Sequence, residues 1–205
     1  MLDARVFKAY DVRGVYGEEL DEESAYRIGR AYVEVFSPAR IAVGRDMRVH
    51  APVMAAAVIA GASEAGAEVI DIGMVGTEML YYAVGSRGLD GGIAVTASHN
   101  PREYTGMKIV RGGALPVGGE SGLLDVRDRA LAIDAPAGWS AATVRREDVY
   151  PGFVEKVLSF VDAGSLRPLR VVIDAANGMA GAMLPPVLER LPQSTLRRRK
   201  LRPQA

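Results

Sequence analysis

The sequence contains no cysteine, only two histidines and one tryptophan among its 205 residues, and it has no long uncharged apolar run. Without cysteine, disulfides and thiolate metal sites are excluded. No apolar segment is long enough to span a bilayer, and residues 1–5 lack the apolar stretch of a secretory signal. From these absences we expect a cytoplasmic protein that does not bind a membrane.

An excess of charge of one sign is also absent, but the zero net charge hides an asymmetry. Residues 190–205 carry six basic residues and no acid, which leaves 19 basic and 25 acidic residues in 1–189. The basic run at 197–200 has no aromatic partner for stacking bases and lies at a terminus rich in proline and glutamine. We therefore predict no nucleic-acid binding and a basic, disordered tail over residues 191–205.

What is present is the composition of a globular protein, with 49% hydrophobic and 24% charged residues. Apolar runs of strand length alternate with segments of helical periodicity, which predicts β-α-β units and a largely parallel sheet. A short strand should pass into a loop over Phe7–Gly14. We expect further strands at 40–43, 68–72, 91–95 and 170–174, and helices at 21–36, 51–66, 77–84 (capped by Thr77), 120–132, 148–161 and after 177–181. The fold class is α/β: a mixed, largely parallel sheet sandwiched by helices, and then the start of a second, similar α/β domain.

The polar stretch Thr96–Pro101 lies between the apolar run Gly91–Val95 and a second apolar run that begins at Gly106. This pattern predicts a strand, a turn and a returning strand. Ser98 then lies at the carboxyl end of a strand, where ligands gather in α/β sheets, and its hydroxyl is a candidate nucleophile. The returning strand brings Lys108 close to Ser98, and an ammonium group suits a phosphate ligand.

Two other interpretations of this stretch are possible. Ser98 and Asn100 can simply form a hydrogen-bonded turn, as serine and asparagine often do. A serine-histidine hydrolase is disfavoured, because the adjacent His99 would point to the opposite face of an extended chain.

Three arginines have the chemistry of a phosphate site, because a planar guanidinium can hold phosphate with two hydrogen bonds. Arg13 can serve in this way or can form an ion pair with Asp11. Arg45 and Arg48 can support the same phosphate; alternatively, Arg45 and Asp46 can pair with each other or cap the next helix. The sequence leaves these alternatives open.

Four stretches, in this order, resemble motifs of the α-D-phosphohexomutases, the phosphomannomutase and phosphoglucomutase superfamily. They are Phe7–Gly14, Val43–Arg48, Thr96–Pro101 followed by Gly106–Lys108, and Val172–Gly181. The resemblance covers the chain from Phe7 to about Glu189. It implies the family's first domain over residues 1–163 and an incomplete start of its second domain over residues 164–190.

The resemblance also implies an activity, the interconversion of hexose 1-phosphate and hexose 6-phosphate, with mannose or glucose as the sugar. Ser98 would carry the phosphate, and Lys108 and Arg13 would be the other catalytic residues. Substrate and phosphate binding would fall to Tyr10, His99, Asn100 and Arg45. The implied cofactors are Mg²⁺, bound to Ser98 through its phosphate, and glucose 1,6-bisphosphate or mannose 1,6-bisphosphate as activator.

The family's Asp-x-Asp-x-Asp stretch, which completes the magnesium site, is missing from the sequence, and the resemblance is lost from Leu191 onward. We therefore expect a truncated or frame-shifted fragment that is inactive on its own. The alternatives are a noncatalytic phosphosugar-binding or scaffold fragment and, within the same class, a phosphoglucosamine mutase. Neither the preferred hexose nor the oligomeric state follows from the sequence.

Overall fold

The computed structural model describes residues 2–166 and 171–191. The chain divides into two compact units, Met1–Glu147 and Asp148–Ala205, which we call unit 1 and unit 2. This division falls earlier than the boundary that we expected from the sequence, between Ala163 and Leu169, and the extent of the family's first domain stays a prediction. The predicted tail over 191–205 lies outside the described residues except for Leu191.

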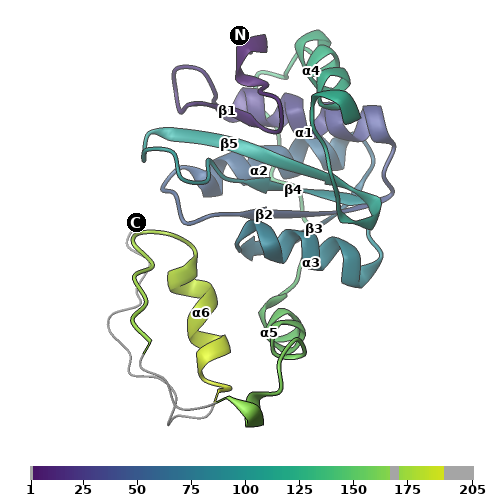
Figure 1. Cartoon of the computed structure of the whole chain (residues 1–205). Helices are drawn as coiled ribbons and strands as arrows, with labels where there is room; N and C mark the ends of the chain where they lie inside the picture. The colour runs from purple at the N-terminus through teal and green to yellow at the C-terminus, as the bar shows by residue number, and fades with distance from the viewer. Residues whose placement is uncertain (1, 167–170, 192–205) are drawn as a thin grey trace. The chain divides into compact units, whose positions relative to one another are not determined.

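Unit 1 is built around a seven-stranded sheet (Figure 1). Its order is β1 (Val12–Val15), β5 (Tyr104–Arg111), β4 (Gly91–Val95), β2 (Arg40–Arg45), β3 (Glu68–Met74) and β7 (Arg145–Arg146), with β6 (Leu115–Pro116) paired to β5. The centre is parallel, because β2 runs parallel to both β3 and β4, whereas β5 is antiparallel to β4 and β1. The predicted mixed α/β sheet is confirmed.

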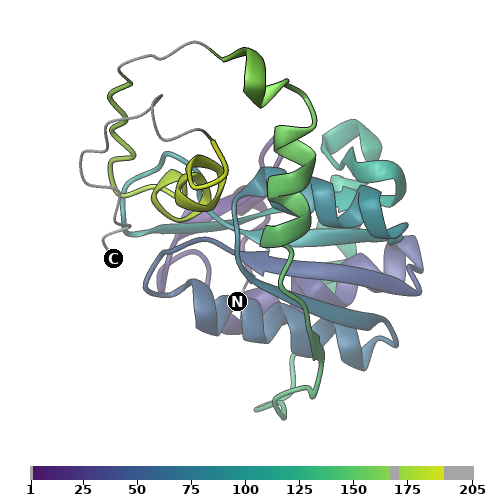
Figure 2. The same cartoon turned by 90° about the horizontal axis from the view of Figure 1, so that it is seen from below.

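Helices cover both faces of this sheet (Figure 1). On one face lie α1 (Glu22–Phe36) and α2 (Ala51–Glu64), with α4 (Leu123–Ala132) packed against α1, and on the other lies α3 (Thr77–Arg87). Figure 2 shows the unit from below, which is the α3 side. Asp21 caps the start of α1, because its side-chain carboxylate accepts a hydrogen bond from the Ser24 backbone amide at 2.8 Å. The helix predicted at 77–84 is confirmed, but its cap is Gly76 and not Thr77.

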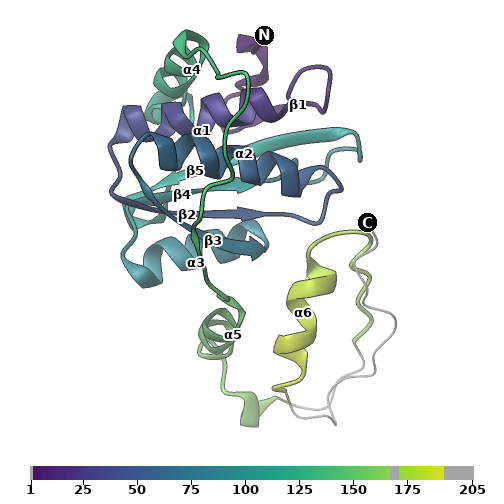
Figure 3. The same cartoon turned by 180° about the vertical axis from the view of Figure 1, so that it is seen from behind.

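Close backbone approach joins α1 to α2. A Cβ atom at Gly61 would overlap the carbonyl oxygen of Tyr26, and one at Gly29 would overlap that of Val58. Glycine is needed here because the helices pack closer than a side chain permits. After α4, the chain passes α1 and α2 on its way to β7 (Figure 3), and Trp139 stacks on Tyr26 with ring centroids 5.0 Å apart.

The parallel centre sets the position of the candidate site. Because β2 and β4 run side by side in the same direction, the segments that follow Arg45 and Val95 leave the sheet at one edge. The Asp46 amide donates to the Val95 carbonyl at 2.9 Å, which joins these two segments directly. The N-terminal segment differs from our expectation: a 3₁₀ turn at Ala4–Val6 and a loop precede β1, so the strand follows the loop.

In unit 2 the structure describes α5 (Tyr150–Leu158), a 3₁₀ turn (Ala163–Ser165) and α6 (Ala180–Leu188). Helices α5 and α6 contact each other, and Arg190 pairs with Glu155 at 2.5 Å. The strand expected at 170–174 is wrong for the part that is described, residues 171–174, which carry no strand pairing. A strand needs a neighbour for its ladder of hydrogen bonds, and the described part of unit 2 supplies none. Within the described residues, no helix has both the length and the hydropathy to cross a membrane.

Candidate active site

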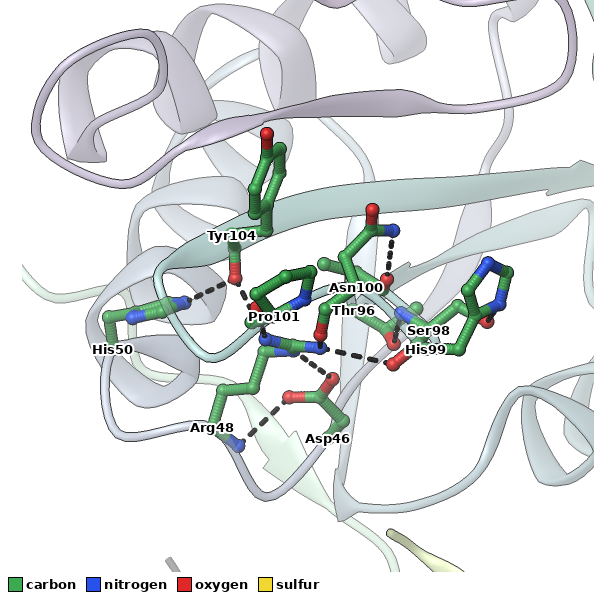
Figure 4. Close-up of polar contacts among 10 residues, drawn as sticks. Asp46, Arg48, His50, Thr96, Ser98, His99, Asn100, Pro101 and Tyr104 are labelled. Atoms are coloured by element: carbon green, nitrogen blue, oxygen red, sulfur yellow. Dashed lines mark hydrogen bonds and ion pairs between the residues drawn. The ribbon is translucent and has the colours of Figure 1, made fainter. Parts of the chain in front are cut away.

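Ser98 begins an exposed turn that is separated from β4 by two residues and leads to β5 (Figure 4). We call residues 96–103 the Ser98 loop. The backbone of Ser98 is left-handed, with φ of +55°, a conformation that residues other than glycine adopt rarely. Its amide donates to the Thr96 hydroxyl oxygen at 2.9 Å. The serine oxygen therefore sits at the surface on a sharply turned backbone.

Asn100 closes the turn. Its backbone amide and its side-chain amide both donate to the Ala97 carbonyl, at 3.1 and 2.7 Å. Further along, the Tyr104 amide donates to the Pro101 carbonyl at 3.1 Å. The hydrogen-bonded turn that we considered as an alternative is thus present, and it presents the Ser98 hydroxyl instead of burying it.

His99 lies closer to Ser98 than we expected. The Ser98 oxygen and His99 Nδ1 are 3.4 Å apart. Our argument that adjacent side chains point to opposite faces was wrong here, because it assumes an extended backbone and Ser98 is left-handed. At 3.4 Å the contact is long for a hydrogen bond to a hydroxyl.

Arg13 and Lys108 meet on one buried carboxylate. Arg13, on β1, donates to Asp11 Oδ2 at 2.5 Å, and the Lys108 ammonium, on β5, lies 3.6 Å from the same oxygen. The ion pair that we left open for Arg13 therefore forms. Arg13 Nε is buried and has no hydrogen-bond partner in the described residues. No hydrogen bond or ion pair joins Arg13 or Lys108 to Ser98 in that same part of the chain.

Two further candidates lie at the surface or at a strand end. Tyr10 is 79% exposed in the loop before β1. Arg45 is the half-buried last residue of β2. The proposed pairing of Arg45 with Asp46 is wrong, because Asp46 pairs with Arg48 at 3.2 Å.

Arg48 and His50 extend from the segment after β2, Arg48 to the Ser98 loop and both to Tyr104, the first residue of β5. We considered Arg48 only as a support for the phosphate, and we did not place His50 in the site. The Arg48 guanidinium donates to four carbonyl oxygens of this region, and His50 Nε2 lies 3.0 Å from the Tyr104 carbonyl (Figure 4). His50 also stacks on Tyr16, with centroids 4.5 Å apart. A hydrogen bond to Glu22, at 2.5 Å, raises the pKa of Tyr16 to about 12, and burial acts in the same direction. The one signal in the sequence was the cluster of charge just after β2.

The described residues do not by themselves fit a magnesium ion. Magnesium requires several oxygen ligands, usually carboxylates with water or phosphate. The carboxylates of Asp11 and Asp46 are both engaged by cations. Residues 2–166 and 171–191 contain no group of three or more acidic or histidine side chains placed to hold a metal. A phosphate on Ser98 would be this region's contribution to such a site.

Comparison with known proteins identifies the family. Residues 4–129 match the model of phosphoglucomutase/phosphomannomutase, alpha/beta/alpha domain I. The chain belongs to the phosphoglucomutase/phosphomannomutase family. It is 44% identical over 187 residues to a phosphomannomutase of Salmonella montevideo, covering 90% of this chain and 41% of that protein. It is 40% identical over 186 residues to a protein named phosphohexose mutases from Xanthomonas campestris pv. campestris, covering 91% and 42%.

Solved structures agree with this family. A phosphoglucomutase/phosphomannomutase family protein from Burkholderia thailandensis matches with a TM-score of 0.75 and 34% identity, over 92% of this chain and 42% of the other. A putative phosphomannomutase from Thermus thermophilus matches with a TM-score of 0.81 at 22% identity, over 100% and 47%, which supports the fold alone. The chain spans about two fifths of the length of the curated relatives described above.

Proposed function

We propose that this chain carries the phosphoserine loop of a phosphohexomutase and that Ser98 is the residue that carries the phosphate. The observation behind this proposal is the exposed Ser98 hydroxyl on a hydrogen-bonded turn, at the edge of the sheet where β2 and β4 end. Family membership supports the reaction class. The whole protein would interconvert hexose 1-phosphate and hexose 6-phosphate, with mannose or glucose as the sugar.

The proposed chemistry is two phosphoryl transfers. In the first, the bond between phosphorus and the Ser98 oxygen breaks as a bond forms to the free hydroxyl of the hexose phosphate, whose proton leaves. In the second, the 1,6-bisphosphate returns its other phosphoryl group to Ser98. A covalent intermediate divides a difficult transfer into two easier ones.

Phosphoryl transfer mainly requires positioning and neutralisation of charge. In our proposal Arg13 and Lys108 supply positive charge, and Lys108 also exchanges a proton with a reacting oxygen. Their shared contact with Asp11 supports a joint role, because it holds two cationic groups beside one another. Tyr10, His99, Asn100 and Arg45 are the proposed contacts to substrate and phosphate.

The cofactors and the location of the protein are further parts of the proposal. Mg²⁺ and a 1,6-bisphosphate activator stay predictions, as does a cytoplasmic location. We also propose that the described residues alone do not complete the two-step turnover of hexose phosphate, because they lack the carboxylate cluster that a magnesium site needs. The single transfer from a 1,6-bisphosphate to Ser98 is the step that we expect this chain to retain. The competing function is a noncatalytic phosphosugar-binding scaffold, and a phosphoglucosamine mutase is the alternative within the class.

Incubation with glucose 1,6-bisphosphate that carries labelled phosphate distinguishes a mutase from a noncatalytic scaffold. We expect the wild-type chain and the control Ser86→Ala, which changes an exposed serine on α3, to take up label, and Ser98→Ala to take up none. A scaffold would leave all three proteins unlabelled. Turnover of glucose 1-phosphate or mannose 1-phosphate by the chain alone would contradict the proposed inactivity in isolation.

A further inference from the structure

Arg48 uses all of its hydrogen-bond donors. A guanidinium has five N–H groups, and the Arg48 side chain makes five hydrogen bonds. Nε donates to Asp46, at 3.2 Å, and the other four bonds go to backbone carbonyl oxygens. The Arg48 and Asp46 side chains are only 7% and 6% exposed. The charge is therefore balanced by one carboxylate, and nothing is left over to bind a ligand.

The four carbonyls belong to one short stretch of chain. Arg48 Nη2 donates to Ser98 at 3.0 Å and to Asn100 at 2.7 Å, and Nη1 donates to Pro101 at 2.7 Å and to Tyr104 at 3.1 Å (Figure 4). One rigid, planar group thus fixes the direction of four peptide units, three in the Ser98 loop and one at the first residue of β5. A lysine ammonium, with three donors on one atom, cannot reproduce this pattern.

The bond to the Ser98 carbonyl acts directly on the residue that carries the proposed phosphate. It restrains the peptide that follows Ser98, while the bond from the Ser98 amide to the Thr96 hydroxyl restrains the peptide before it. A left-handed serine is costly and persists only where the surroundings impose it. Arg48 is a large part of those surroundings.

His50 supplies a second anchor at the far end of the stretch. Its Nε2 lies 3.0 Å from the Tyr104 carbonyl, which also accepts from Arg48. Because a carbonyl oxygen only accepts, His50 must carry its hydrogen on Nε2 to bond there. The stack on Tyr16 holds the imidazole ring in place.

We propose that Arg48 is a positioning residue: it presets the Ser98 loop, and with it the direction of the Ser98 oxygen, without touching the phosphate. Its effect on phosphoryl transfer rests on the proposed function, whereas its effect on the loop does not. The competing explanation is that the Arg48–Asp46 ion pair only stabilises unit 1. That explanation predicts that the loss of Arg48 weakens unit 1 uniformly. Our proposal predicts a loss of order confined to the Ser98 loop and the adjoining Tyr104.

The test is Arg48→Lys, with Arg30→Lys as the matched control, since Arg30 pairs with Glu34 and Glu64 on the surface of the helical layer. In Arg48→Lys we expect the amides of Ser98, Asn100 and Tyr104 to exchange with solvent at least about tenfold faster, with β2 amides unchanged. Equal changes in the loop and in β2, or no change in the loop, would overturn the proposal. In Arg30→Lys the loop amides should exchange as in wild type.

Labelling kinetics give the catalytic readout. At saturating glucose 1,6-bisphosphate, we expect Arg48→Lys to label Ser98 at least about tenfold more slowly, because small misplacements of a reacting group cost large factors in rate. The bisphosphate concentration that gives half the maximal rate should stay unchanged, because Arg48 does not contact the ligand. If even the wild-type chain takes no label, the proposed function fails, while the amide exchange still decides whether Arg48 orders the loop.

A measurement on the wild-type chain keeps the proposal testable if Arg48→Lys does not fold. In the ¹⁵N NMR spectrum of arginine side chains, the Nη protons of Arg48 should give separate, slowly exchanging signals, since each is hydrogen-bonded and buried. Arg127, which the structure places on the surface of α4 beside Asp128, serves as the internal comparison. Averaged Arg48 signals that exchange as fast as those of Arg127 would overturn the proposal.

Discussion

Ser98 offers a direct test of its own backbone conformation, through the pair of variants Ser98→Gly and Ser98→Ala. Both remove the hydroxyl and its 3.4 Å contact with His99, so their difference in stability reports on the backbone alone. Ser98 is exposed, and neither variant creates a cavity. Because φ is +55° at this position, we expect the glycine variant to be the more stable of the two.

The magnitude follows from two opposing contributions. A left-handed conformation costs an alanine about 1–2 kcal/mol and costs a glycine almost nothing. Glycine loses more backbone freedom on folding, which offsets about 0.5–1 kcal/mol of that advantage. The expected net difference is about 0.5–1 kcal/mol in favour of Ser98→Gly. At Ser86, inside α3, the order should reverse, and Ser86→Ala should be more stable than Ser86→Gly by about 0.5–1 kcal/mol.

Urea denaturation measures these differences in the free energy of unfolding. Trp139, the sole tryptophan of the sequence, stacks on Tyr26 in unit 1, so its fluorescence follows unfolding of that unit. The reversed order at the two serines is the diagnostic result. If Ser98→Ala equals or exceeds Ser98→Gly in stability, Ser98 is not left-handed in solution, and the account of a preset loop fails with it.

Two other regions of unit 1 give predictions. Gly61→Ala should destabilise unit 1 by about 1–3 kcal/mol, because its Cβ would overlap the Tyr26 carbonyl. Gly85→Ala, on α3, should be neutral or stabilising, because its Cβ would make only an ordinary contact with Ala114 at 4.0 Å. Equal effects in urea denaturation would contradict the close packing of α1 on α2. Burial opposes ionisation of Asp21, but its hydrogen bonds from Ser24 outweigh burial and lower the pKa below the ordinary 3.8. A carboxyl whose pKa is lowered by folding stabilises the fold above its ordinary pKa and loses this effect as the pH falls through the lowered value. The stability advantage of wild type over Asp21→Asn should therefore shrink below about pH 3.8, and an advantage that grows on acidification would refute this.

Much of the fold could be predicted because its elements are specified by local patterns. The acidic residues of the first turn and the apolar spacing after them predicted α1, and the apolar run before Thr96 predicted β4. The predicted ends of the strands were less accurate. For example, β2 continues to Arg45 because Val95 and Met74 pair with it there. The same dependence on partners explains the strand wrongly expected at 170–174.

The candidate site was predictable only in part. A polar turn after a buried strand predicted that Ser98 follows the carboxyl end of that strand, and the returning strand placed Lys108 on β5. The left-handed backbone of Ser98 and the positioning role of Arg48, which we considered only as a support for the phosphate, were missed for one physical reason. Arg48 bonds to backbone carbonyls, which every residue has, so its partners leave no side-chain pattern in a single sequence.

The central claim is that the oxygen of Ser98 carries the phosphate, and peptide mapping tests it most directly. Cleavage after Arg87 and Arg102 releases residues 88–102, in which Thr96 and Ser98 are the hydroxyl side chains. After incubation of the wild-type chain with glucose 1,6-bisphosphate, fragmentation mass spectrometry should find one added phosphate in this peptide, on Ser98. Phosphate on Thr96, on another peptide or on none would contradict the account.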